Sequence, residues 1–72
     1  MVRGLLMHYI RLRNLREDCD FSQNQVAKFL HCSQSAYSRI ESGRQDIPTL
    51  FLKKLAKLYN VTTDYILEMD RS

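Results

Sequence analysis

Two serines, Ser22 and Ser33, constrain the fold of this 72-residue chain more than any other feature. Ser22 is followed three residues later by Gln25, which is the pattern of a capping box at the start of a helix. Ser33 is a second helix-capping serine, so the helix between the two serines must be short. The sequence therefore predicts two consecutive helices joined by a tight turn.

The second of these helices, predicted from Gln34 to Glu41, has two distinct faces at about 100° per residue. One face carries Ala36, Tyr37 and Ile40, and the other carries Gln34, Ser35, Ser38 and Arg39. The first face is apolar and is expected in the core, whereas the second is polar throughout. Ser42-Gly43 is expected to end the helix, because glycine readily adopts the left-handed conformation.

Three further amphipathic segments complete an all-α prediction for a single domain over residues 1–72. A first helix is expected from Leu5 to about Asp18, and a fourth from Pro48 to Tyr59. Pro48 is interpreted as the first helical residue, where its missing N–H has no consequence, and Asn60 as the stop. Thr62 is expected to cap a short fifth helix.

Two short helices, the second with a polar outer face, form the helix-turn-helix arrangement. The runs from Phe21 to Ala27 and from Ser33 to Gly43 resemble the xenobiotic-response-element family, which includes lambdoid phage repressors and Cro proteins. Leu55-Ala56-Lys57 and the run from Val61 to Tyr65 resemble its fourth and fifth helices, so the resemblance covers about residues 10–68. It implies a compact five-helix, lambda-repressor-like domain with the motif at about residues 22–42.

The resemblance and the side-chain chemistry indicate the same DNA-binding residues. A glutamine can pair with adenine N6 and N7, and an arginine with guanine O6 and N7, so Gln34 and Arg39 are predicted to read bases in the major groove. Ser35 and Ser38 would assist them. The resemblance implies that Gln23 contacts a phosphate, as helix N-termini do. Further phosphate-binding candidates are Ser33, Arg44 and Gln45.

The resemblance also implies a structural ion pair between Arg16 and Glu41, which would tie the first helix to the recognition helix. Two positions depart from the family pattern, since His31 stands where glycine is usual and Tyr37 where an aliphatic residue is usual. A non-glycine residue can hold a left-handed conformation at a cost of about 1 kcal/mol. We therefore expect a slightly altered turn and a reshaped core beneath the third helix.

The charge balance agrees with a polyanionic partner, because eleven Lys and Arg exceed eight Asp and Glu and give a net charge of +3. Lys53, Lys54 and Lys57 are interpreted as a solvent-facing run on the fourth helix. No apolar stretch is long enough to cross a bilayer, and no signal peptide is recognised. We expect a cytoplasmic protein that is bacterial or phage-encoded.

Catalytic and metal sites are not expected. Ser22, His31 and Cys32 lie at helix caps or a turn with no pocket between them, so we predict that the chain is not an enzyme. Cys19 and Cys32 are interpreted as reduced thiols, and their spacing to His8 and His31 does not fit zinc. Neither a cofactor nor a small-molecule effector is predicted.

The predicted function is sequence-specific binding of duplex DNA by a small transcriptional regulator, expected to be a repressor acting as a homodimer on a palindromic operator. The apolar residues of the fifth helix and its approach predict the dimer interface, which comprises Val61, Tyr65, Ile66 and Met69, with Leu6 and Met7 as further contributors. Alternatively, Ile66 and Leu67 close the core and dimers form only on DNA. An antitoxin or a protein-interaction module on the same fold remains the alternative function.

Overall fold

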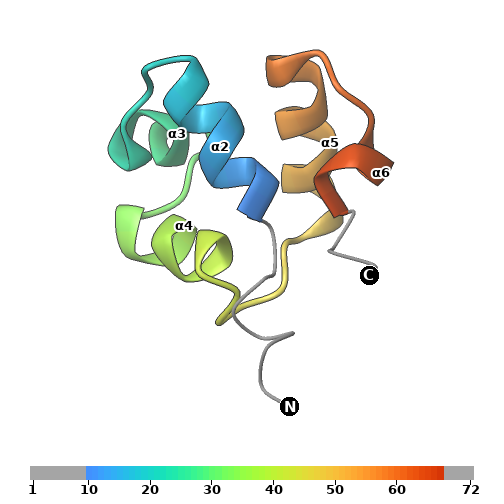
Figure 1. Cartoon of the computed structure of the whole chain (residues 1–72). Helices are drawn as coiled ribbons and strands as arrows, with labels where there is room; N and C mark the ends of the chain where they lie inside the picture. The colour runs from blue at the N-terminus through green and yellow to red at the C-terminus, as the bar shows by residue number, and fades with distance from the viewer. Residues whose placement is uncertain (1–9, 68–72) are drawn as a thin grey trace.

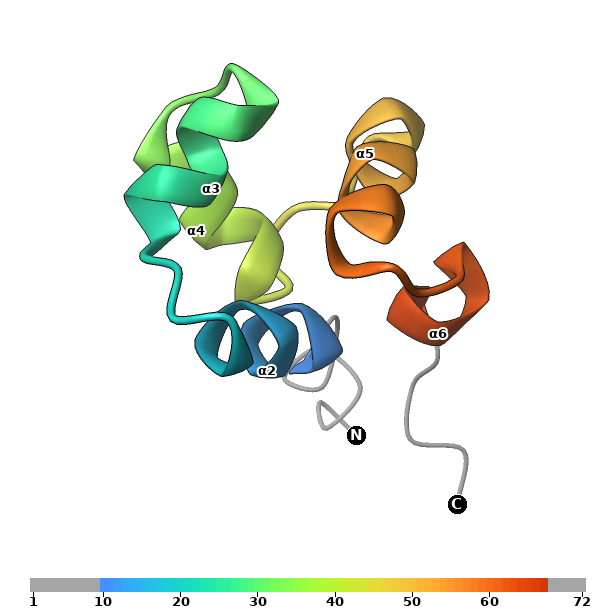
Figure 2. The same cartoon turned by 90° about the horizontal axis from the view of Figure 1, so that it is seen from above.

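The computed structural model describes residues 10–67, and this part of the chain consists of five α-helices without a strand. The helices are α2 (Ile10–Asp18), α3 (Gln23–Leu30), α4 (Gln34–Glu41), α5 (Thr49–Tyr59) and α6 (Thr63–Leu67). In Figures 1 and 2, α3 and α4 lie on one side, α5 and α6 lie on the other, and α2 contacts both α4 and α6. The all-α prediction is confirmed, while its residues 5–9 of the first helix lie outside the described part.

The core takes at least one side chain from every described helix. It consists of Leu12, Val26, Ala27, Leu30, Tyr37, Ile40, Leu55, Ala56, Tyr59 and Ile66. Tyr37 has no exposed surface and is the largest of the fully buried side chains. A tyrosine ring therefore fills the space beneath α4, as expected from the departure at this position, and its burial turns the opposite face of α4 outward.

The predicted caps explain where α3 and α4 begin and end. Ser22 and Gln25 form the reciprocal capping box. The Gln25 backbone N–H donates to the Ser22 hydroxyl oxygen at 3.0 Å, and the Ser22 backbone N–H donates to Gln25 Oε1 at 2.8 Å. His31 takes the left-handed conformation at φ 61° and ends α3. Gly43, at φ 83°, lies just beyond the end of α4, and the residues that follow it fold back over the end of the helix.

The start of α5 differs from the prediction by one residue, because the helix begins at Thr49 and not at Pro48. Pro48 has φ −63° and ψ 145°, so it is the extended residue before α5 and not the first helical residue. The proline ring fixes φ but leaves ψ free, and here ψ is extended. Asn60, at φ 57°, ends α5 as predicted.

The fifth predicted helix, α6, also requires a correction. Ile66 has no exposed surface and packs in the core, so it is not available to a partner as the interface prediction requires. Ile66 closes the core, as the alternative expects, whereas Leu67 is 41% exposed and does not. Met69, Leu6 and Met7, which belong to the same interface prediction, lie outside the described residues.

Two general properties emerge from the described residues. None of their helices has the length and apolar character that crossing a membrane requires. Across residues 10–67, no three His, Cys, Asp or Glu side chains are grouped so as to hold a metal ion. Cys19 is exposed and Cys32 half-buried, and both are free thiols.

Candidate nucleic-acid interface

The polar face of α4 points outward because both ends of the helix and its apolar side are fixed. The Ser33 hydroxyl accepts a hydrogen bond of 3.0 Å from the Ala36 backbone N–H, which satisfies a donor at the start of the helix. Tyr37 and Ile40 are buried on the inner side. The predicted base-reading residues then lie outside, with Gln34, Ser35 and Arg39 exposed and Ser38 half-buried.

An open polar hollow brings most of the predicted DNA-binding residues together. Its lining residues are Gln23, Gln34, Ser35, Ser38, Arg39 and Arg44. They come from the first residue of α3, the outer face of α4 and the loop after α4. Two predicted phosphate-binding residues, Ser33 and Gln45, are not part of this lining. The hollow carries two arginines and neutral hydrogen-bonding groups, a composition suited to a polyanion.

Arg16 and Glu41, the pair implied by the family resemblance, are in direct contact. Arg16 Nε donates to Glu41 Oε2 at 2.7 Å and Arg16 Nη2 donates to Oε1 at 3.2 Å. Their side chains are only 12% and 5% exposed. Arg16 Nη1 also donates to the Phe21 carbonyl oxygen at 2.9 Å. The guanidinium therefore joins α2, the loop before α3 and the last residue of α4.

Gln23 extends this cluster toward the surface, an arrangement that the sequence did not predict. Its Nε2 donates to Glu41 Oε1 at 3.1 Å. Burial opposes ionisation of Glu41, but hydrogen bonds from Arg16 and Gln23 outweigh burial and hold the pKa of Glu41 below its ordinary value. The hydrogen bond to Glu41 raises the pKa of Arg16 despite burial. No periodic pattern could have indicated a contact between the start of α3 and the end of α4.

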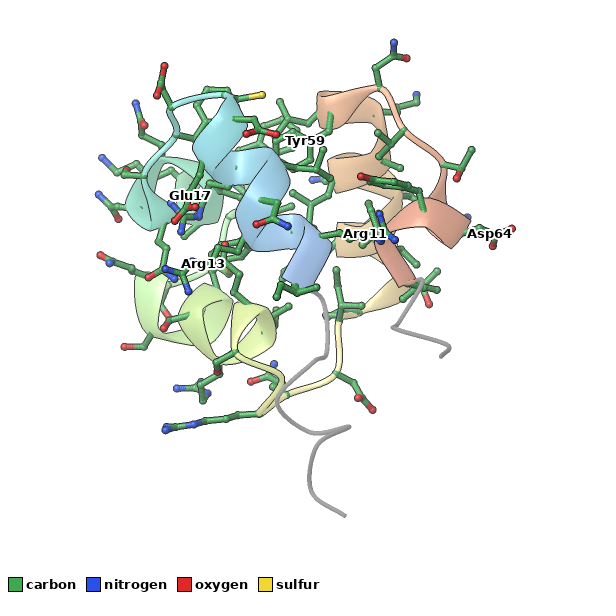
Figure 3. All side chains as sticks on the ribbon, in the orientation of Figure 1. Arg11, Arg13, Glu17, Tyr59 and Asp64 are labelled. Atoms are coloured by element: carbon green, nitrogen blue, oxygen red, sulfur yellow. The ribbon has the colours of Figure 1, made fainter. Side chains whose placement is uncertain are left out.

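A second polar hollow adjoins the first and brings Arg13 to the same surface. Gln23 and Ser38 line both hollows, and Arg13, Arg16, Glu41 and Ser42 complete the second. Arg13 pairs with Glu17 at 3.1 Å, and the two side chains are 65% and 52% exposed. Figure 3 shows both on the side of α2 opposite Arg11. An exposed pair of this kind contributes about 0.3–0.5 kcal/mol, so Arg13 is not firmly held.

Two tyrosine hydroxyls are buried in the interior of the fold. Among the described side chains, the Tyr37 and Tyr59 hydroxyls are buried without a hydrogen-bond partner. Burial, and after it the nearby negative charge of Glu41, raises the pKa of Tyr37. The Tyr37 hydroxyl and the Glu41 carboxylate are not placed to form a hydrogen bond. Burial is also the main cause that raises the pKa of Tyr59 to about 12. Both hydroxyls therefore stay protonated at neutral pH.

Of the predicted dimer residues, the structure describes Val61, Tyr65 and Ile66, which lie in α6 and the loop before it, away from α3 and α4 (Figure 1). Tyr65 is 38% exposed, and the Arg11 guanidinium lies 4.4 Å from the centre of its ring. Figure 3 shows Arg11 beside α6. Val61 is half-buried, and Leu50 at the start of α5 is 60% exposed.

Comparison with known proteins agrees with this arrangement. A family model described as a helix-turn-helix domain matches residues 10–68. The HTH-type transcriptional regulator ImmR of Bacillus subtilis (strain 168) is 37% identical over 60 residues, which cover 83% of this chain and 47% of ImmR. The competence pilus inhibition repressor of Acinetobacter baylyi is 36% identical over 55 residues, which cover 76% of this chain and 50% of that protein. The chain thus spans about half the length of these curated relatives.

A solved structure shows the same fold. The N-terminal DNA binding domain of SinR from Bacillus subtilis superposes with a TM-score of 0.71, covering 90% of this chain and 100% of that domain. The sequence identity is 23%, so this likeness establishes the architecture of the helices and nothing finer.

Proposed function

This chain belongs to the helix-turn-helix domain family, and from that premise we propose that it binds duplex DNA with α4 in the major groove. The observation that carries the proposal is the polar hollow that joins the start of α3, the outer face of α4 and the loop after it. The buried Arg16–Glu41 pair supports it, because the pair fixes the end of α4. A rigid helix with a polar outer face can enter a groove without reorganising.

Base readout is assigned to α4. Gln34 and Arg39 are exposed and long enough to reach base edges, where they would pair with adenine and guanine respectively. Ser35 and Ser38 are short, so they let the helix approach closely. Each bidentate contact contributes about 1–3 kcal/mol of discrimination between bases.

Phosphate contacts are assigned to the rim of this face. Gln23 uses one amide N–H on Glu41 and retains the second for a phosphate oxygen. The Ser33 oxygen accepts the Ala36 N–H and leaves the hydroxyl proton free to donate. Arg44 is exposed and supplies a full positive charge beside Arg39 in the hollow. These contacts would orient the protein without reading sequence.

The biological role is assigned by analogy with the relatives. ImmR is named a transcriptional regulator and the Acinetobacter protein a repressor, which supports a role for this chain as a repressor. We propose in addition that it acts in the cytoplasm and is not an enzyme. We assign residues 1–72 to one domain. Its motif is assigned to about residues 22–42, and the caps at Ser22 and Ser42 support these bounds.

One recognition helix spans few base pairs, so a homodimer on a palindromic operator would raise specificity, with half-sites about 34 Å apart. Val61 and Tyr65 remain candidate contacts.

Selection of preferred sites from a random DNA pool tests the proposal. The parent should enrich a defined sequence, and Gln34→Ala and Arg39→Ala should each lose preference at one base pair while remaining folded. Asn14→Ala, which removes an exposed amide on α2, is the control and should select the parental site. A parent that enriches no sequence would refute the proposal and favour a protein-interaction module.

Salt dependence separates phosphate contacts from base contacts. Arg44→Gln should weaken binding to every sequence alike and make the log–log salt slope shallower by about 1, because one fewer counterion is released. Lys57→Gln on the exposed side of α5 removes the same charge and should leave the slope unchanged. Equal salt slopes for the parent and Arg44→Gln would show that Arg44 does not contact a phosphate. Sedimentation of the protein with and without operator DNA would show whether it forms a homodimer and whether the homodimer requires DNA.

A further inference from the structure

We propose that Gln45 is a positioning residue that holds Arg39 for base readout, in place of the phosphate contact predicted from its sequence position. The inference rests on the proposed function, because it concerns the geometry of one of the base-reading side chains. It makes a loop residue outside the recognition helix responsible for part of the sequence preference.

The side chain and the main chain of Gln45 both contact Arg39. Arg39 Nε donates a hydrogen bond to Gln45 Oε1 at 3.2 Å. The backbone N–H groups of Gln45 and Arg44 donate to the Arg39 carbonyl oxygen, at 3.2 Å and 2.9 Å. Gly43, at φ 83°, makes the reversal that brings the loop back over the end of α4. The main-chain hydrogen bonds thus hold residues 39 and 45 close together. Their side chains can therefore meet without further ordering of the loop.

The hydrogen bond occupies the part of the guanidinium that guanine recognition can do without. Arginine carries five N–H donors, and the bond to Gln45 uses the one on Nε. The two Nη groups remain as the fork that can donate to guanine O6 and N7 together. Both side chains are exposed, so this fork is accessible.

Glutamine suits this task because its amide oxygen accepts a hydrogen bond without neutralising the arginine. A long arginine side chain loses rotamer freedom when it binds, and restraint in the free protein removes part of that cost. The expected gain is about two- to tenfold in preference for the base pair that Arg39 reads. A phosphate contact by Gln45 would instead act equally on all sequences.

Two variants of Gln45 distinguish these roles. Gln45→Met has similar length but no acceptor, and Gln45→Glu retains an acceptor for Arg39 Nε. Binding is measured by titration on the selected site and on sites altered at the base pair whose preference Arg39→Ala removes. Gln45→Met should lower preference at that base pair by about two- to tenfold. Gln45→Glu should keep the preference while weakening binding to all DNA through its negative charge.

The decisive control is the same substitution in the Arg39→Ala background. Gln45→Met should have no effect there, because the side chain it positions is absent. Uniform weakening of every sequence, persisting in the Arg39→Ala background, would overturn the proposal and restore the phosphate contact. Asn14→Ala again serves as the control for loss of an exposed polar side chain.

A measurement without DNA tests the contact itself. In the free protein, the Arg39 Nε–H resonance in a ¹⁵N spectrum should shift and exchange faster with solvent in Gln45→Met than in the parent. An unchanged resonance would overturn the inference whether or not DNA binds. A parent without sequence preference would instead refute the proposed function, and the resonance would still decide whether Gln45 holds Arg39.

Discussion

The turn between α3 and α4 and the turn between α5 and α6 have nearly the same backbone, yet they join very different helices. His31 and Asn60 occupy the same left-handed position, with φ/ψ of 61°/41° and 57°/48°. The N–H of the next residue then bonds to a carbonyl of the preceding helix, at 3.0 Å in both turns. Each turn therefore reverses the chain by one left-handed residue that is not glycine.

The two turns also start the next helix in the same way. Ser33 and Thr62 each accept a hydrogen bond of 3.0 Å from the backbone N–H three residues further on. The helices that begin at these caps are different. Helix α4 has eight residues, a polar outer face and a buried ion pair at its end, whereas α6 has five residues and exposes Tyr65 and Leu67. Turn geometry sets the direction of the second helix, but its surface and its anchoring determine what it can bind.

The largest difference between the α3–α4 pair and the α5–α6 pair should be the effect of removing the contact that each makes with an arginine of α2. Glu41→Ala leaves the part-buried Arg16 without its carboxylate and should lower the free energy of unfolding by up to about 3–5 kcal/mol. Arg11→Ala removes the stacking contact with Tyr65 beside α6 and should cost about 1 kcal/mol. Urea unfolding of both variants measures the two costs. Equal losses in the free energy of unfolding would mean that the Arg16–Glu41 contact stabilises the fold no more than the Arg11–Tyr65 contact.

Acid should weaken the contact between Arg16 and Glu41 at the end of α4. Because the pKa of Glu41 is lowered in the folded state, its ionisation stabilises the fold above the ordinary value of 4.5, and this contribution is lost as pH falls through the folded pKa. Glu41→Gln should therefore lose less stability than the parent between neutral pH and about pH 3. Urea unfolding at both pH values tests the sign. A parent and variant with the same loss would show that other carboxylates dominate acid unfolding.

The local features of both halves could be predicted from the sequence because they depend on neighbouring residues. Ser22 and Ser33 cap α3 and α4, and Asn60 ends α5, each through contacts within about one turn of helix. The boundaries of α4 are set directly by its caps and its two faces. The family resemblance supplied the distant pairing of Arg16 with Glu41, which local patterns alone do not indicate.

The remaining features depend on distances that residue spacing does not encode. The bonds from Gln23 to Glu41 and from Arg39 to Gln45 require long side chains to meet across a fold or a loop. The sequence predicts Ile66 at a dimer interface and keeps the core as the alternative, because a five-residue helix is too short for periodicity to separate its inner face from its outer face. Pro48 illustrates a smaller limit, since its fixed φ is compatible with either side of a helix boundary.

Removing the two capping hydroxyls should sharpen the comparison on a smaller scale. Ser33→Ala leaves an N–H of α4 without its partner and should cost about 1 kcal/mol. Thr62→Ala should cost less, because α6 is only five residues long and its Ile66 anchor remains buried. Thermal unfolding of the two variants gives the order. A larger loss for Thr62→Ala would show that α6 depends on its cap more than on its buried side chain.

The smallest effect should come from the left-handed residues themselves. A Cβ in this conformation costs about 1 kcal/mol, which asparagine reduces by local hydrogen bonding, whereas glycine avoids the cost but loses about 0.5–1 kcal/mol of backbone entropy on folding. His31→Gly should therefore stabilise the protein by at most about 0.5 kcal/mol, and Asn60→Gly should not stabilise it. Both side chains are exposed, so neither change removes buried contacts. Equal shifts in Tm would show that the two turns carry the same strain, and that the histidine in the turn before α4 has no more energetic consequence than the asparagine before α6.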